Sequence, residues 1–187
     1  MLHHSKGGGD IEVMGYLRGK VEGDTFIIMD AYPLPVEATE TRVNAGDDAI
    51  EYTGKLEDLN EEMLKKENCV GWYHSHPNYG PWLSGIDVAT QRTMQMSDPM
   101  LALVIDPIRS MLQGTVDIGA FRACPEDSHP GNENNSDSVI PEEKIKDFGV
   151  NYKQYYKLEI SYFMNKNDAG LIEQTWTRFW KSILGGD

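Results

Sequence analysis

Short runs of β-branched and apolar residues, separated by turn-forming residues, recur along the chain and predict a β-sheet. These strands are expected at residues 11–20, 25–32, 69–73, 100–105 and 114–122. The Gly-containing segment 22–24 predicts a hairpin turn between the first two strands. The runs at 69–73 and 100–105 show no alternation with polar residues, which is typical of central strands buried on both faces.

Helical spacing appears between the predicted strands. After Asp47 and Asp48, apolar residues recur at intervals of four, three and four, at Tyr52, Leu56, Leu59 and Met63. Two further helices are expected, at 84–96 and at 168–184. Strands that alternate with helices predict an α/β domain with a mixed β-sheet flanked by helices, followed by a C-terminal helical arm.

The remaining segments set the expected domain organisation. One domain is predicted over residues 1–165, and the C-terminal helix occupies 166–187. Residues 1–9, which include a glycine run, are expected to be the end of a helix that begins before this sequence. The polar stretch 36–46 is predicted as a loop, and so is 123–146, which is rich in Gly, Asn, Ser and Pro.

Composition and charge narrow the classes of partner. The 187 residues carry a formal net charge of −13, which disfavours binding to a phosphate backbone, so no nucleic-acid partner is expected. No run approaches the about 20 apolar residues of a membrane span, so no membrane association is expected. The only two cysteines, Cys69 and Cys124, form no disulfide framework and favour a reducing compartment.

The segment between His74 and Asp87 contains residue types that bind metals. Residues two apart at the end of an extended segment face the same side, so His74 and His76 can present imidazoles to one point. Asp87 falls in the first turn of the next predicted helix and can fold back onto that point. Two imidazoles and one carboxylate are typical of catalytic zinc and leave one coordination position for water.

Structural alternatives exist for each of these residues. A His-x-His pair alone is a weak signal, and Ser84-x-x-Asp87 also matches a capping box at a helix start. Both interpretations of Ser84 are compatible, since a hydroxyl can cap a helix and still face a metal. Glu12 lies between apolar residues in a predicted strand, and the residue pattern alone favours a solvent-facing edge position for it.

The combination of Glu12-Val-Met-Gly, His74-Ser-His-Pro and Ser84-Gly-Ile-Asp resembles the JAMM (MPN+) family of zinc isopeptidases. The resemblance implies an MPN domain and one Zn²⁺ per chain. It implies that His74, His76 and Asp87 bind the zinc. It also implies that Glu12 is the catalytic acid and base and that Ser84 stabilises the oxyanion.

Further blocks resemble the Jab-type cullin deneddylases of the COP-nine signalosome. They include Glu-Thr-Arg-Val-Asn-Ala at 40–45 and a tyrosine-rich block at 147–163. The resemblance implies removal of a ubiquitin-like modifier from lysine side chains of a neddylated cullin. It implies partners among the other signalosome subunits, especially an MPN scaffold subunit, and a location in the cytoplasm and nucleus.

The same resemblance implies how the site is reached and restrained. The modifier's tail is expected in a groove beside Trp82. The 36–46 loop, through Glu40, Thr41 and Arg42, is expected to cover the site, so that the isolated chain is nearly inactive. Asn78 and Pro81 depart from the Gly and Cys that are usual in this branch. Two alternatives stay open: a deubiquitinase of the same family, and a non-catalytic MPN scaffold.

Overall fold

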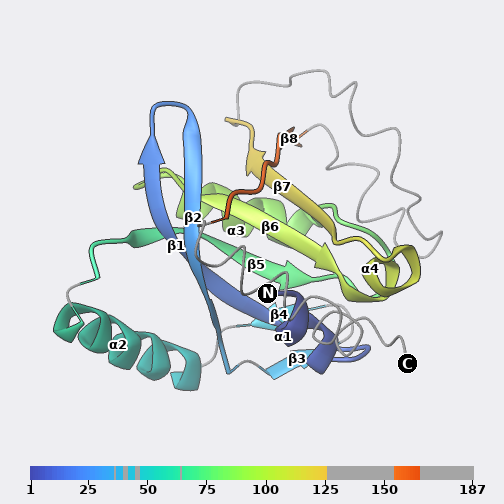
Figure 1. Cartoon of the computed structure of the whole chain (residues 1–187), viewed down its shortest axis with the longest axis horizontal. Helices are drawn as coiled ribbons and strands as arrows, with labels where there is room; N and C mark the ends of the chain where they lie inside the picture. The colour runs from blue at the N-terminus through green and yellow to red at the C-terminus, as the bar shows by residue number, and fades with distance from the viewer. Residues whose placement is uncertain (36, 40–41, 45–46, 64, 126–153, 165–187) are drawn as a thin grey trace.

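A six-stranded sheet forms the centre of the molecule in this computed structural model, which describes residues 1–35, 37–39, 42–44, 47–63, 65–125 and 154–164 (Figure 1). Its strands are β1 (Met14–Glu22), β2 (Thr25–Pro33), β5 (Asn68–Ser75), β6 (Leu101–Asp106), β7 (Asp117–Ala123) and β8 (Tyr155–Leu158). They lie in the order β2-β1-β5-β6-β7-β8. Because β5 and β6 are parallel and the other neighbours antiparallel, the predicted mixed sheet is confirmed.

The central strands carry the sequence signals that predicted them. β1 and β2 form the expected hairpin, and Gly23 in the turn has a φ of 58°, which glycine adopts without strain. β5 is longer than predicted and reaches Ser75, so that His74 belongs to the strand and His76 directly follows it. β8 was not predicted; its backbone pairs with β7 at the other edge of the sheet.

The helices lie on both sides of the sheet. They are α1 (Leu2–Gly7), α2 (Asp47–Glu62), α3 (Gly85–Met94) and α4 (Pro107–Gln113). Val88 of α3 joins the core on the sheet face that also carries Trp72. On the opposite face, the Nδ1 atom of His4 in α1 lies 2.9 Å from the hydroxyl of Tyr73.

Helix α4 was not predicted: the sequence analysis expected a strand at 100–105 and no helix directly after it. The Asp106 side chain accepts a hydrogen bond from the backbone N–H of Arg109, and Pro107 occupies the first turn, where no N–H donor is needed. Gly114 ends the helix with a left-handed φ of 68°. Asp106-Pro107 therefore ends β6 and begins α4 at once.

The segment 36–46, predicted as a loop, contains a small hairpin in its described part. Two short strands, β3 (Glu37–Thr39) and β4 (Arg42–Asn44), pair antiparallel with each other in this segment. A local hairpin of this kind satisfies its own backbone groups without joining the main sheet, so it needs no apolar alternation. The two residues between the strands, Glu40 and Thr41, lie outside the described part of the chain.

Helix α2 begins at Asp47 as predicted, but two of the apolar residues whose spacing predicted it, Leu59 and Met63, are exposed. Leu59 is 50% exposed and Met63 is 61% exposed. The helix is instead held by an ion pair between Arg18 of β1 and Glu57, with Nη1–Oε1 at 2.5 Å. A cavity of about 270 Å³ lies between α2 and the sheet. Neither His74 nor His76 lines it.

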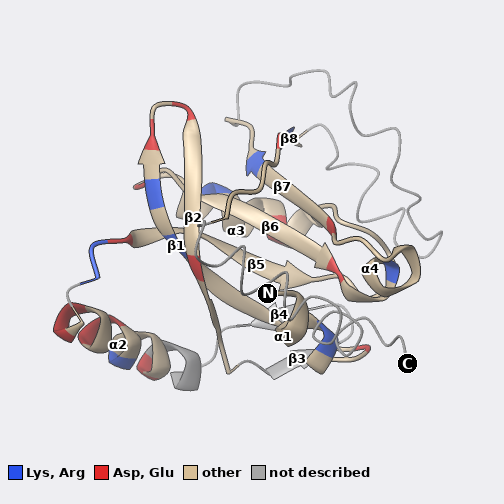
Figure 2. Cartoon of the chain, in the orientation of Figure 1, with Lys and Arg blue, Asp and Glu red and all other residues tan. Residues whose placement is uncertain are grey.

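Charged residues are distributed unevenly over the described surface. Acidic side chains gather along α2 and at the tip of the β1–β2 hairpin (Figure 2). No described helix is long and apolar enough to cross a membrane. The predicted helix at 168–184 and most of the predicted loop at 123–146 lie outside the described residues.

Candidate metal centre

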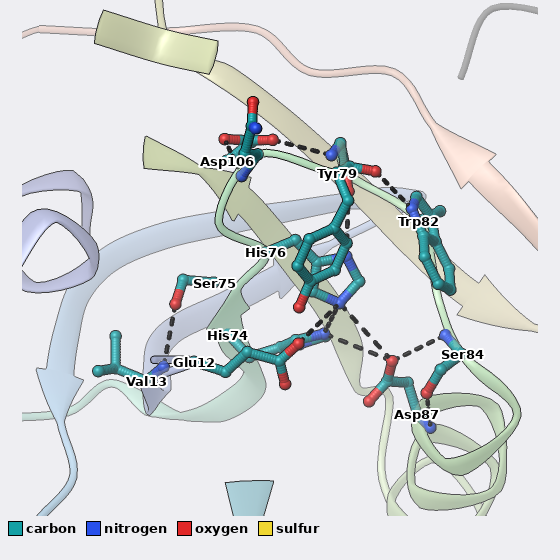
Figure 3. A network of polar contacts seen from close by, with 12 residues as sticks. Glu12, Val13, His74, Ser75, His76, Tyr79, Trp82, Ser84, Asp87 and Asp106 are labelled. Atoms are coloured by element: carbon teal, nitrogen blue, oxygen red, sulfur yellow. Dashed lines mark hydrogen bonds and ion pairs between the residues drawn. The ribbon is translucent and has the colours of Figure 1, made fainter. Parts of the chain in front are cut away.

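Two histidines at the end of β5 converge, as their spacing predicts. His74 stacks on Trp72 of the same strand face, with ring centroids 4.8 Å apart and planes 13° from parallel. The indole N–H of Trp72 in turn donates to Oε1 of Gln91 in α3 at 2.8 Å. The Nε2 atoms of His74 and His76 lie 3.0 Å apart (Figure 3). Both imidazoles are therefore fixed on the side of the sheet that α3 covers.

The orientation of His76 is set by its other ring nitrogen. Nδ1 lies 3.0 Å from the carbonyl oxygen of Gly80, and because a carbonyl can only accept, Nδ1 must carry the proton. The ring also packs against Tyr79 and Trp82, with centroids 4.4 Å and 5.0 Å away. The lone pair of Nε2 is consequently directed into the cluster, as a metal ligand requires.

Asp87 reaches the histidines because of the helix start that holds it. Ser84 caps α3 by accepting from the Asp87 N–H at 3.2 Å, while the Ser84 N–H donates to Oδ2 of Asp87 at 2.7 Å. This is the capping box that the sequence indicated. The same Oδ2 lies 3.5 Å from Nε2 of His74 and 4.0 Å from Nε2 of His76. The Asp87 side chain therefore both completes the cap of α3 and offers a ligand atom to the cluster.

Charges within the cluster shift its protonation equilibria. Burial alone would raise the pKa of Asp87, but the imidazoles of His74 and His76 and the bond from Ser84 hold it well below its usual range. Burial likewise favours neutral His74, yet the attraction of Asp87 outweighs it and raises the pKa of His74. Without a metal, the Asp87 carboxylate therefore favours a proton on His74, at the position where a bound cation would interact with both groups.

The donor set fits a zinc ion. Tetrahedral zinc with bonds of about 2.0–2.1 Å holds its ligand atoms about 3.3 Å apart. The three separations in the cluster, 3.0, 3.5 and 4.0 Å, lie around that value. His74, His76 and Asp87 form the metal-ligating group found among the described residues. Two imidazoles and one carboxylate favour zinc over calcium or magnesium, which prefer oxygen ligands.

Glu12 lies beside this cluster. Its Oε1 is 4.0 Å from Nε2 of His76, and the residue is 6% exposed, so the solvent-facing alternative is wrong. The neighbouring Val13 is fastened to the end of β5, because its N–H donates to Oγ of Ser75 at 2.9 Å and its carbonyl accepts from the Ser75 N–H at 2.9 Å. The sequence analysis did not single out Ser75, whose role depends on pairing between distant segments.

The structure places the other predicted site residues less directly. Trp82 is 2% exposed and its indole N–H donates to the Tyr79 carbonyl at 2.7 Å, so its ring supports His76 rather than lying open on the surface. The substrate groove beside Trp82 stays a prediction. Arg42 belongs to β4.

Comparisons with known proteins agree with this geometry. A family model described as "JAB1/Mov34/MPN/PAD-1 ubiquitin protease" matches residues 1–100. COP9 signalosome complex subunit 5 of Oryza sativa subsp. japonica is 52% identical over 186 residues, which are 98% of this chain and 52% of that protein. The subunit 5 proteins of Dictyostelium discoideum and Drosophila melanogaster are 52% and 50% identical, and the matches cover 98% and 99% of this chain and 56% and 57% of theirs.

The chain thus spans about half the length of the curated relatives that it matches. The family model covers more than half of the chain, including the segment that bears Glu12, both histidines and Asp87. The converging side chains lie within the matched region and have the chemistry of a metal centre. The chain belongs to the JAB/MPN family.

Proposed function

We propose that the chain is a zinc-dependent isopeptidase that removes a ubiquitin-like modifier from lysine side chains, with cullin deneddylation as its reaction. The observation that carries this proposal is the meeting of three candidate ligands with a buried carboxylate, Glu12, at 4.0 Å from His76. A non-catalytic scaffold has no need to bury a carboxylate beside a ligand cluster, since moving a charged group out of water is costly.

Each residue has a distinct role in this mechanism. His74, His76 and Asp87 hold the ion. When bound, zinc lowers the pKa of a coordinated water to about 7 and polarises the scissile carbonyl. Glu12 accepts the proton of the attacking water and delivers it to the departing lysine amine. The Ser84 hydroxyl uses a lone pair to cap α3, so its proton remains suited to the carbonyl oxygen as that oxygen becomes negative.

The biological setting is part of the same proposal. The relatives are named as subunits of the COP9 signalosome, which supports assembly of this chain with other signalosome subunits, including an MPN scaffold partner. The enzyme would then act on neddylated cullins in the cytoplasm and nucleus. The segment that contains Glu40, Thr41 and Arg42 would restrain the isolated chain, so the activity is to be measured in the assembled complex.

The test is Glu12→Gln, which keeps the shape of the side chain and removes its ability to accept a proton. We expect zinc content equal to that of the unaltered chain and cleavage of neddylated cullin slower by about 10²-fold or more. Asp10→Asn is the matched control, because Asp10 is an exposed acid two residues away. Full cleavage by the zinc-loaded Glu12→Gln enzyme would reject the assigned role.

Deubiquitination is the second candidate, because the matching family model is described as a ubiquitin protease. The same residues would act on a different modifier. Cleavage of neddylated cullin and of ubiquitin chains, measured side by side with the same assembled enzyme, separates the two. A preference for ubiquitin chains would replace the deneddylase assignment and leave the metal chemistry unchanged.

A further inference from the structure

A buried carboxylate from another element holds the loop between β5 and α3, residues 77–83. Asp106, at the end of β6, is 0% exposed. Its Oδ1 accepts from the backbone N–H of Asn78 at 3.1 Å, and its Oδ2 accepts from that of Gly80 at 2.8 Å (Figure 3). Oδ1 also accepts from the N–H of Arg109 at 2.8 Å, which caps α4. One side chain therefore joins the loop, the sheet and a helix.

Gly80 connects this carboxylate to the metal cluster. Its N–H donates to Asp106, and its carbonyl accepts the Nδ1–H of His76 at 3.0 Å. Two consecutive hydrogen bonds thus lead from Asp106 to a candidate zinc ligand. The partner of the non-ligating nitrogen selects the tautomer of a ligating histidine and the direction of its ring.

The backbone conformation of the loop explains why it needs the hydrogen bonds to Asp106. Asn78 and Gly80 both have left-handed backbones, with φ of 68° and 81°. A side chain on Gly80 would come within 2.7 Å of Nη1 of Arg109, so the loop also lies close to α4. Glycine adopts this conformation without strain, but for Asn78 it is sparsely populated and persists only where the surrounding structure holds it. The hydrogen bonds from the N–H groups of Asn78 and Gly80 to Asp106 hold the loop in this conformation.

We propose that Asp106 is a positioning residue for the metal centre: by holding Gly80 it fixes the Nδ1–H tautomer and the ring direction of His76. Asp106 contacts neither the candidate ligands nor a reacting atom. The inference deepens the proposed function and rests on it for the identity of the ion. Loss of such an outer partner weakens metal binding by about 10–100-fold, and for one bond further out we expect about 10-fold.

The informative variant is Asp106→Asn. Its one remaining oxygen can still accept from Asn78 and Arg109, which preserves the cap of α4, but its NH₂ group then faces the Gly80 N–H. We expect zinc affinity, measured by competition with a chromogenic chelator at fixed pH, to fall by about 10-fold. In the metal-free chain, ¹⁵N NMR should show His76 changing from a pure Nδ1–H form to a mixture of tautomers.

Ser110→Ala is the matched control. Ser110 is also buried, its hydroxyl donates to the Asp106 carbonyl at 2.5 Å, and it accepts from the Asp117 N–H at 2.8 Å. Its loss should destabilise α4 and leave both zinc affinity and the His76 tautomer unchanged. This control separates a general loss of stability from a specific effect on the loop.

A measurement on the unaltered chain covers the case in which Asp106→Asn does not fold. The Gly80 amide should exchange slowly with solvent before any zinc is added, because Asp106 and not the ion holds the loop. Exchange at the rate of an unprotected amide would overturn the inference. A folded Asp106→Asn chain with the original zinc affinity and His76 tautomer would overturn it as well.

The same measurements distinguish failure of the inference from failure of the proposed function. If the unaltered chain binds no zinc, the zinc isopeptidase proposal is rejected. A protected Gly80 amide and an Nδ1–H form of His76 that depends on Asp106 would still support the positioning role in that case. If zinc binds tightly but the His76 tautomer is the same in Asp106→Asn as in the unaltered chain, only the positioning role is rejected.

Discussion

At the scale of single residues, the loop that follows His76 contains one unusual backbone conformation. Asn78 is the one non-glycine residue with positive φ in the described part of the chain, at 68°. Asparagine tolerates this conformation better than most residues because its short polar side chain can bond locally. Glycine adopts this φ at no steric cost, which gives a physical reason for the glycine that the family resemblance leads us to expect at this position.

A pair of substitutions tests the conformation of Asn78. Asn78→Ala should lower the free energy of unfolding by about 1 kcal/mol, because alanine pays the full steric cost of the left-handed region. Asn78→Gly should change it by less than about 0.5 kcal/mol. Chemical denaturation measures both, with Asn68→Ala, an exposed residue in β5, as the control. Equal stability of the alanine and glycine variants would contradict this explanation.

At the scale of elements, the site depends on how one strand end is fastened to another. Glu12 precedes β1, and its neighbour Val13 pairs with Ser75 at the end of β5 through two hydrogen bonds. The Ser75 side chain is fully buried, and Ser75 stands between His74 and His76 in the sequence. The proposed catalytic carboxylate and the two candidate histidine ligands are therefore positioned by the same end of β5.

Removing the Ser75 hydroxyl should separate catalysis from metal binding. Ser75→Ala leaves the Val13 N–H without its acceptor, and we expect a loss of roughly 1–3 kcal/mol of stability. Turnover should fall because Glu12 is no longer held, while zinc content stays at one per chain. Kinetics of the assembled enzyme and metal analysis measure the two effects. Ser110→Ala, which removes another buried hydroxyl, should keep full turnover; a similar loss there would point to stability alone.

At the scale of the whole molecule, the candidate centre joins segments that are far apart in sequence. Residues 12, 74–76 and 84–87 meet because β1 and β5 are neighbours in the sheet and α3 packs on the same face. A metal bound there links β5 to α3 and adds its binding free energy to the folded state only. The stability of the domain should therefore depend on both metal and pH.

Zinc should stabilise the chain against heat, by about 2.7 kcal/mol when its concentration is 100 times Kd. Protons compete for the histidines, so this gain should shrink as the pH falls from 7.5 to 5.5. The stability that the His74–Asp87 pair gives the metal-free chain should instead increase as the pH falls. Because Asp87 raises the pKa of His74 above its usual value of about 6.5, the stabilising ion pair is complete below that pH and is lost as the pH rises through the raised pKa.

Thermal unfolding at several pH values, with zinc and with a chelator, measures both trends. An exposed acid-to-amide variant such as Asp10→Asn serves as the control, since it changes the net charge without touching the cluster. A zinc-induced rise in melting temperature that grows on acidification would contradict the assignment of the two histidines as ligands.

The sequence by itself determined the local features of this protein. The His-x-His spacing, the capping box that contains Asp87, and the β1–β2 hairpin depend on neighbours within a few residues, and all three are present in the structure. Such features are readable because the period of a strand and the geometry of a helix start are fixed by the backbone. The family resemblance was readable for the same reason, since it rested on short blocks.

Only the tertiary structure decided which side chains are buried and which distant segments meet. The residue pattern alone left Glu12 at a solvent-facing edge, but pairing with β5 buries it beside His76. The spacing of Leu59 and Met63 predicted a helix but not their exposure: Leu59 lies exposed on α2, and Met63 lies exposed directly after it. Asp106 was not singled out in the sequence, and its bonds to the loop arise because β6 lies beside β5. Strand order and the layers packed on a sheet are set by long-range contacts. The local periodicity of the sequence carries no information about these contacts.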